Sequence, residues 1–95
     1  MTSVKVWTQT IAHVRHNPFW IWDFVTDPYA AEEFAFEMVQ KLDPCTDDEQ
    51  DLIEDIAKEY VSTWRSKWDN MSRREKIALA ESLEQFGLDI DYQLI

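Results

Sequence analysis

The sequence predicts an all-α protein, folded as a compact bundle of four to five helices with a short extended C-terminal tail. Apolar residues recur at the three- and four-residue spacing of amphipathic helices in most segments. The chain has only one glycine and three prolines, and each lies where a helix would begin or end. Two segments also begin with serine or threonine followed three residues later by glutamate, the pattern of a capping box.

The chain length predicts one domain, residues 1–95, with one hydrophobic core, because so short a chain buries little more than about 60% of its unfolded surface. Hydrophobic residues make up 45%, which is typical of globular proteins that need no metal. Cys45 is the only cysteine, so we expect no intrachain disulfide. No signal-peptide pattern occurs in the first 25 residues, and no apolar run approaches the roughly 20 residues that span a bilayer. We expect a cytoplasmic protein.

The first expected helix covers residues 4–16, with Ser3 as its cap. Its expected buried face consists of Val4, Trp7, Ile11 and Val14. β-Branched residues at its start leave a strand as the alternative for its first half. The second helix, residues 18–25, begins at Asn17-Pro18, where proline in the first turn loses no hydrogen bond. It is apolar on nearly all sides, so we expect it to be buried or partly covered by a partner.

The third expected helix covers residues 28–42 and begins at Asp27-Pro28. Its main apolar stripe consists of Ala31, Phe34, Ala35, Met38 and Leu42. Tyr29, Phe36 and Val39 lie away from that stripe. A helix with two apolar sides belongs in the middle of a bundle, or has one side in an interface.

The fourth expected helix covers residues 47–68 and opens with the Thr46/Glu49 capping box. Its apolar stripe consists of Leu52, Ile53, Ile56, Ala57, Tyr60, Val61, Trp64 and Trp68. This is the longest amphipathic segment, so we expect the other helices to pack along it.

The fifth expected helix covers residues 73–86, opens with the Ser72/Glu75 capping box and ends at Gly87, since glycine adopts the left-handed conformation at helix ends. Its expected inward residues are Ile77, Ala80, Leu83 and Phe86. The tail, residues 88–95, alternates apolar and polar residues, which predicts an extended segment on the bundle or a strand paired with another chain's tail.

The charge of the chain indicates what it binds. The formal net charge is −10, which repels nucleic-acid phosphates and anionic membranes and attracts basic protein surfaces. We therefore expect no direct contact with nucleic acid or membrane. The alternative is that the acidic residues only keep the protein soluble.

Four acidic residues of the fourth helix form a row on one face: Asp48, Asp51, Asp55 and Glu59. Like charges at this spacing cost roughly 0.2–0.5 kcal/mol per pair, although Lys58 can pair with Glu54 or Asp55. Carboxylates one turn apart lie about 5–6 Å from each other, close to the phosphate spacing of a nucleic-acid strand. With Glu33 and Glu37, the row predicts a partner-binding face that imitates DNA. Alternatively, acids near the helix start only complement its dipole.

The aromatic second helix offers a candidate anchor for a protein interface. Trp20 and Trp22 are the residues proposed for this role, because buried aromatic anchors dominate many interfaces. Packing in the core is the alternative for each of them. A homodimer formed through Trp22, Phe36 or the tail is a further alternative.

Catalytic and metal sites are not expected. His13 and His16 are the only histidines, and with Glu33 and Glu37 they lack the spacing of a di-metal or zinc motif. The single glycine excludes a glycine-rich phosphate loop. We expect no enzyme activity and no cofactor. Basic residues cluster only at Arg65, Lys67, Arg73, Arg74 and Lys76. We expect the last three to form ion pairs with Asp69, Glu75 or neighbouring helices, and a small anion-binding corner is the alternative.

These observations predict a non-enzymatic protein that inhibits or modulates a DNA- or RNA-handling enzyme with a basic cleft, by protein–protein contact and DNA mimicry. In size and charge the chain is similar to small acidic inhibitors that phages and mobile elements direct against restriction, recombination and CRISPR machinery. The alternative is a structural or accessory subunit that acts through an aromatic homodimer or heteromer interface.

Overall fold

The computed structural model describes residues 2–95, which form five α-helices and no β-strand. The helices are α1 (Ser3–His16), α2 (Phe19–Thr26), α3 (Ala30–Leu42), α4 (Asp47–Asn70) and α5 (Arg73–Glu84), and a 3-10 turn, η1 (Tyr92–Leu94), closes the chain. The predicted all-α class is confirmed, and each α-helix begins and ends within two residues of its expected bounds. In the part of the chain that the structure describes, no helix combines the length and hydrophobicity that crossing a membrane requires.

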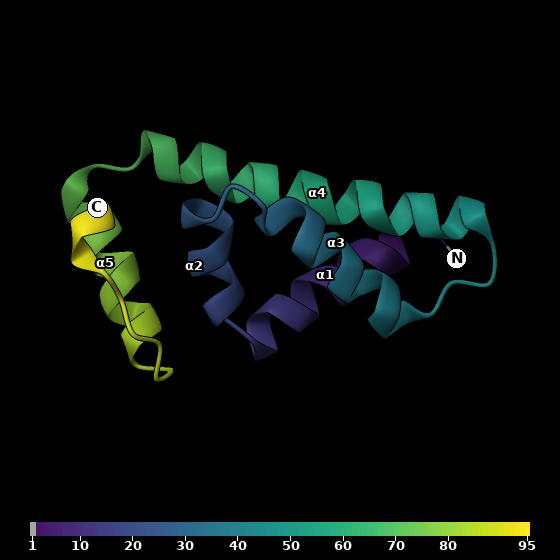
Figure 1. Cartoon of the computed structure of the whole chain (residues 1–95), viewed down its shortest axis with the longest axis horizontal. Coiled ribbons are helices and arrows are strands. Elements are labelled where there is room, and N and C mark those ends of the chain that lie inside the picture. Colours follow the sequence, from purple (N-terminus) through teal and green to yellow (C-terminus); the bar gives the residue numbers. More distant parts are fainter. Residues whose placement is uncertain (1) are drawn as a thin grey trace.

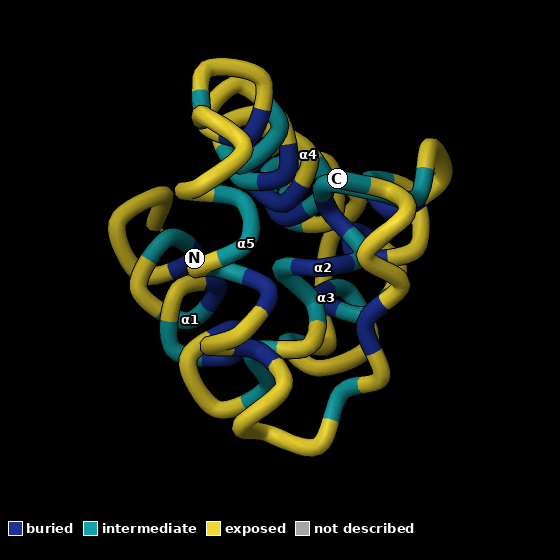
Figure 2. Tube along the Cα trace, turned by 90° about the vertical axis from the view of Figure 1, so that its left-hand side faces the viewer, coloured by how far each residue is buried: buried dark blue, intermediate teal, exposed yellow. Residues whose placement is uncertain are grey.

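Helix α4 sets the shape of the molecule. A helix of its 24 residues is about 36 Å long, and the longest dimension of the protein is 43 Å. Helices α1, α2 and α3 lie along one side of α4, while α5 and the tail lie at its C-terminal end (Figure 1). In Figure 2 the buried residues of α4 face this inner side and its exposed residues follow the outer side.

The hydrophobic interior divides into two clusters. The body cluster joins α1, α2 and α3 to α4 and consists of Val6, Val14, Phe24, Ala30, Phe34, Ala35, Met38, Ile53, Ile56, Ala57 and Val61. The arm cluster joins α5 and the tail to α2 and the end of α4 and consists of Trp22, Trp68, Ala80, Leu83 and Ile90. Ile21 packs against both clusters. The expected single core is divided because α4 is too long for three short helices to cover.

Two helix starts show how the predicted capping boxes form. At α5 the box is complete: the Ser72 hydroxyl accepts from the Glu75 N–H at 3.2 Å, and the Glu75 carboxylate accepts from the Ser72 N–H at 3.1 Å. At α4 the Thr46 hydroxyl accepts from the Glu49 N–H at 3.2 Å. The Glu49 carboxylate, however, accepts from the Cys45 N–H at 3.0 Å, so only half of the expected box forms there.

Other caps differ from expectation. The hydroxyl that caps α1 belongs to Thr2, and Ser3 is the first helical residue. Asn17 does not cap α2; its side-chain amide donates to the His13 carbonyl at 3.0 Å and closes α1. The Asp27 carboxylate accepts a backbone N–H at 2.9 Å just before α3 begins. Pro18 and Pro28 therefore lie ahead of their helices rather than inside the first turn.

The buried face of α1 is not the predicted one. It consists of Val6, Thr10, His13 and Val14, whereas Val4 is 73% exposed and Ile11 lies at the surface. Two polar residues belong to this face because each finds a partner there. The Thr10 hydroxyl donates to the Val6 carbonyl at 2.8 Å, and His13 pairs with Glu37 of α3. The strand alternative for the first half is excluded.

Helix α5 turns Ala80 and Leu83 inward, as predicted, but Phe86 is 67% exposed. The reason is that α5 ends at Glu84, before the turn of helix that would have carried Phe86 inward. Gly87 follows with φ of 85°, the left-handed conformation expected of it.

The tail folds back onto α5 but is not extended throughout. We call α5 and the tail together the arm. Ile90 is buried in the arm cluster, while Tyr92 and the residues after it form η1. The Asp91 carboxylate caps this turn by accepting from the Gln93 N–H at 3.0 Å. The Glu84 carboxylate beside the Tyr92 hydroxyl raises the pKa of Tyr92 to about 12. The expected alternation therefore fails where a side-chain cap starts a turn.

Candidate partner-binding site

The predicted acidic row lies on the outer face of α4. Its members, Asp48, Asp51, Asp55 and Glu59, are all exposed. Ile53 and Ala57, which interleave with them in sequence, are fully buried. At 100° per residue the row points away from these two side chains, so it faces solvent along nearly three turns.

No ion pair neutralises the row. Among residues 2–95, no carboxylate of the row lies within ion-pairing distance of a cation; the contact at that distance joins His13 to Glu37, and it is an ion pair only when His13 is protonated. The expected pairing of Lys58 with Glu54 or Asp55 is absent, since the Glu54 carboxylate accepts from the Gln50 amide at 3.4 Å instead. The row therefore presents uncompensated negative charge.

The helix dipole accounts for only one member of the row. Asp48 lies in the first turn of α4, together with Asp47 and Glu49. Stabilisation of an acid by the dipole falls off within that turn, so Asp55 and Glu59 gain little from it. Stabilisation by the helix dipole therefore does not explain why Asp55 and Glu59 are acidic.

The two acids of α3 that were predicted to belong to the site differ in their surroundings. Glu33 is exposed, whereas Glu37 is half-buried and its Oε1 lies 3.5 Å from His13 Nε2. Glu37 therefore belongs to the contact between α1 and α3 rather than to an open charged face. Only Glu33 of these two is free to extend the acidic surface.

The His13 ring is held between α1 and α3. It is 8% exposed and stacks on Phe34 with 6.3 Å between centroids. Nε2 has no hydrogen bond in the structure. Burial, with the Lys41 ammonium as a second cause, holds the pKa of His13 below its usual 6.5, although Glu37 opposes the shift. The imidazole is therefore predominantly neutral near pH 7.

Neither proposed tryptophan anchor lies open on the surface. Trp22 is 7% exposed and meets the Trp68 ring edge-on, with centroids 5.7 Å apart. Trp20 is half-buried and packs against Phe34 at 5.3 Å. Trp22 therefore serves the arm cluster, and a contact with a partner through its ring requires the arm to open.

The exposed aromatic side chains are different ones. Tyr29 is 70% exposed, Phe36 is 65% exposed and Phe86 is 67% exposed. Phe36 lies away from the buried face of α3, and Tyr29 immediately precedes that helix. The displacement of Tyr29, Phe36 and Val39 from the main stripe of α3 was the sequence signal for this second apolar side.

A groove follows the contact between α3 and α4. It has a volume of about 310 Å³ and is lined by Glu32, Ala35, Phe36, Val39, Gln50, Glu54 and Lys58. A second hollow shares Val39 and Gln50 with it and continues to Gln40, Asp43 and Pro44. We call these two hollows together the α3/α4 groove. Its apolar lining consists of Ala35, Phe36, Val39 and Pro44, and its charged lining residues are Glu32, Asp43, Glu54 and Lys58.

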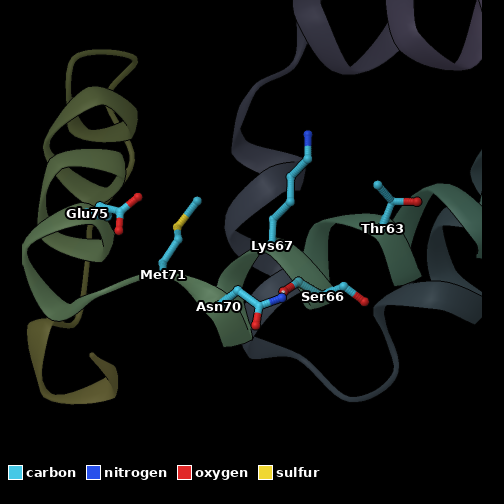
Figure 3. A pocket seen from close by; sticks show the side chains of 6 residues that line it. All are labelled: Thr63, Ser66, Lys67, Asn70, Met71 and Glu75. Atoms are coloured by element: carbon cyan, nitrogen blue, oxygen red, sulfur yellow. The ribbon is translucent and has the colours of Figure 1, made fainter.

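A second groove, of about 540 Å³, lies in the angle between α4 and α5 and is lined by Thr63, Ser66, Lys67, Asn70, Met71 and Glu75 (Figure 3). Several of its polar groups already have partners. The Thr63 hydroxyl donates to the Glu59 carbonyl and the Asn70 amide donates to the Ser66 carbonyl. Lys67 lies over the Trp64 ring at 4.9 Å. No converging set of free donors marks this groove as an anion site.

The basic residues near the α4–α5 turn do not form the expected ion pairs with Asp69 or Glu75. Lys76 lies over the Trp68 ring, 5.0 Å from its centroid. Arg65 donates from Nε to the Phe24 carbonyl at 2.8 Å and from its terminal nitrogen to the Asp27 carbonyl. Lys76 and Arg65 therefore meet an aromatic face and backbone carbonyls instead of carboxylates.

Groups that support metal chemistry are not brought together. Within residues 2–95, no three His, Cys, Asp or Glu side chains lie where they could hold one metal ion. His13 and Glu37 meet, while His16, one turn further along α1, is exposed to solvent. Cys45 is an exposed free thiol in the turn before α4.

Comparison with known proteins adds no relative. No protein-family model matches the sequence, no curated protein matches it, and no solved structure matches its fold. The chemistry of the exposed surface is therefore the basis on which a function is proposed.

Proposed function

We propose that this protein is a non-enzymatic binder that inhibits or modulates a DNA- or RNA-handling enzyme through protein–protein contact. Its acidic row on α4 takes the place of a nucleic-acid strand in the basic cleft of that enzyme. The observation that carries this proposal is the row itself: Asp48, Asp51, Asp55 and Glu59 are exposed, lie one turn apart and have no ion-pairing partner among residues 2–95. Small acidic inhibitors of the phage and mobile-element type, including anti-restriction proteins, act in this manner.

The physical basis is charge complementarity. Opposite potentials on two surfaces accelerate encounter and select the correct partner, and exposed charge contacts are screened beyond about 10 Å at 0.1 M salt. A rigid helix adds regular spacing, because α4 is packed against three other helices along its inner side. Binding through the row should therefore be strong at low salt and weak at high salt.

The first test is capture of partners by the tagged protein from nuclease-treated bacterial lysate, with the bound proteins identified by mass spectrometry. We expect a nucleic-acid enzyme that is released at high salt. The purified enzyme is then offered its own duplex or RNA substrate as a competitor. Displacement of the protein by that substrate supports mimicry, and simultaneous binding of both contradicts it.

Charge reversal provides the matched variants. Changing Asp48, Asp51 and Asp55 to Lys should weaken binding of the captured enzyme by at least about tenfold while helicity is retained. The control changes Asp69, Glu81 and Asp89 to Lys, which alters the net charge equally at exposed positions outside the row. Equal loss in both variants would mean that total charge, and not the row, determines binding.

The exposed aromatics favour a second candidate function, that of an accessory subunit. Tyr29, Phe36 and Phe86 are each at least 65% exposed, and exposed aromatic side chains of this size are typical anchors of protein interfaces. Light scattering across a concentration series tests the homodimer form. A monomer at every concentration excludes it.

A further inference from the structure

We propose that the α3/α4 groove is a docking site for a basic amphipathic helix of a partner protein, with Phe36 as its apolar contact. This inference rests on the proposed function, because it supplies the same partner with a second and apolar contact beside the acidic row. Phe36 then takes the anchor role that the sequence predicted for Trp22, since Trp22 is buried in the arm cluster.

The shape of the α3/α4 groove fits a helix. The groove follows α3 from Glu32 to Asp43, and eleven residues of helix extend about 16 Å, which is three turns. The backbone groups of both banks are already paired within helices, so an extended peptide would find no strand edge to join. An amphipathic helix needs only side-chain contacts, and it meets such grooves with residues at helical spacing.

The exposed ring of Phe36 is an apolar surface that a partner would shield from water. Phe36 is 65% exposed while its neighbour Ala35 is 3% exposed, so the ring stands on the rim above a closed floor. Val39 is half-buried beside it, and Pro44 continues the apolar lining at the far end. An apolar side chain of a partner placed between Phe36 and Val39 would remove both from water.

The charge of the groove selects the partner. Glu32, Asp43 and Glu54 lie along its banks, against the single cation Lys58. Asp51 and Asp55 continue the negative charge from the α4 bank onto the acidic row. A second copy of this chain, with net charge −10, would bring like charges together, and nucleic acid would be repelled as well. A helix that carries lysine or arginine matches both the shape and the negative charge of the groove.

The probe for the test is a synthetic helical peptide of about fifteen residues, built from leucine and lysine with leucine on one face. A peptide of the same composition in scrambled order has equal charge but no apolar face. Each is titrated into the isotopically labelled protein and followed by NMR chemical shifts. We expect the amphipathic peptide to shift signals of Phe36, Val39 and Glu54, and to bind more tightly than the scrambled peptide.

Three variants locate the contact. Phe36→Ala should weaken binding of the amphipathic peptide about tenfold, the loss typical of an interface anchor. Phe86→Ala removes a ring of nearly equal exposure on the arm and should leave the affinity unchanged. Lys58→Gln removes the one cation that lines the groove and should strengthen binding. All three residues are exposed, and circular dichroism checks that each variant keeps its helices.

Several outcomes overturn the docking site. Signal shifts outside the groove would do so, as would equal affinity for the two peptides or equal effects of Phe36→Ala and Phe86→Ala. Failure of the proposed function is a separate result. If the amphipathic peptide binds the groove but no nucleic-acid enzyme is captured, the groove stands without that function. If an enzyme is captured equally well by Phe36→Ala, the function stands and the groove does not take part.

Discussion

The body cluster and the arm cluster contain the same kinds of side chain but differ in how completely they exclude water. Phe24 and Phe34 in the body cluster are fully buried, with ring centroids 4.7 Å apart. In the arm cluster Trp22 is 7% exposed and Trp68 is 8% exposed. The difference arises because three helices cover the inner side of α4 in the body, while α5 and the tail cover it at the end. Helix α4 is therefore covered more completely along the body cluster than at its C-terminal end.

This inequality predicts two levels of stability. Regions with few buried apolar contacts open at lower free energy than the closed core, and amide hydrogen exchange measures the difference. We expect the amides of α1 and α3 to exchange only with global unfolding. Those of α5 should exchange earlier, through local opening of the arm.

The largest expected effect is that of Phe34→Ala. Phe34 is fully buried and packs against the rings of Phe24, Trp20 and Tyr60. Its removal should reduce the free energy of unfolding by about 3–5 kcal/mol, a large part of the typical 5–15 kcal/mol. Urea denaturation followed by circular dichroism measures the loss. If this variant does not fold, Phe34→Leu provides a milder change at the same site.

Leu83→Ala tests the arm cluster. Leu83 is 3% exposed, and its truncation should cost about 2–4 kcal/mol, less than Phe34→Ala. The loss should appear in hydrogen exchange of α5 while α1 and α3 stay protected. Uniform loss of protection in all five helices would show that the two clusters unfold as one unit, and the contrast between them would then disappear.

A smaller effect is expected at the start of α5. Ser72→Ala removes the hydroxyl of the complete capping box and should cost about 1 kcal/mol. Because this cap belongs to the arm, it should increase opening of α5 without affecting α3. Ser82→Ala, at an exposed position inside the same helix, is the matched control and should change little.

The finest distinction is pH dependence just below neutrality, which should arise in the body cluster. His13 has a pKa below 6.5 in the native state, so the unfolded chain binds its proton at a higher pH than the folded chain does. Stability should therefore be fully present above about pH 6.5 and fall as the pH drops toward the native pKa. His13→Gln should flatten this part of the curve of unfolding free energy against pH. His16→Gln, at an exposed position on the same helix, should not.

The elements predictable from sequence were those fixed by local chemistry. Ser72 and Glu75 form their box and Gly87 takes its left-handed conformation because both depend on neighbours in the chain. The buried face of α1 was missed because Thr10 and His13 are polar. Their burial depends on a carbonyl of α1 and a carboxylate of α3, and only the second of these requires tertiary structure.

The candidate site shows the same division. Exposure of Asp51, Asp55 and Glu59 follows from helical spacing, so the row was predictable. Which aromatic residues stay exposed was not, because Trp22 is covered by α5 and Trp68, and no local pattern predicts where a later helix will pack. The displacement of Phe36 from the main stripe was visible in the sequence, but the groove beside it depends on the packing of α3 against α4.

The edge-on contact of Trp22 and Trp68 has an optical consequence. Two indoles with centroids 5.7 Å apart exchange excitation energy, which produces a paired positive and negative band in circular dichroism. That band reports on the junction of α2 with α4 and is superimposed on the signal of the helical backbone. The protein thus contains an intrinsic spectroscopic probe that needs no label. It distinguishes opening of the arm that preserves the contact of Trp22 with Trp68 from opening that breaks this contact.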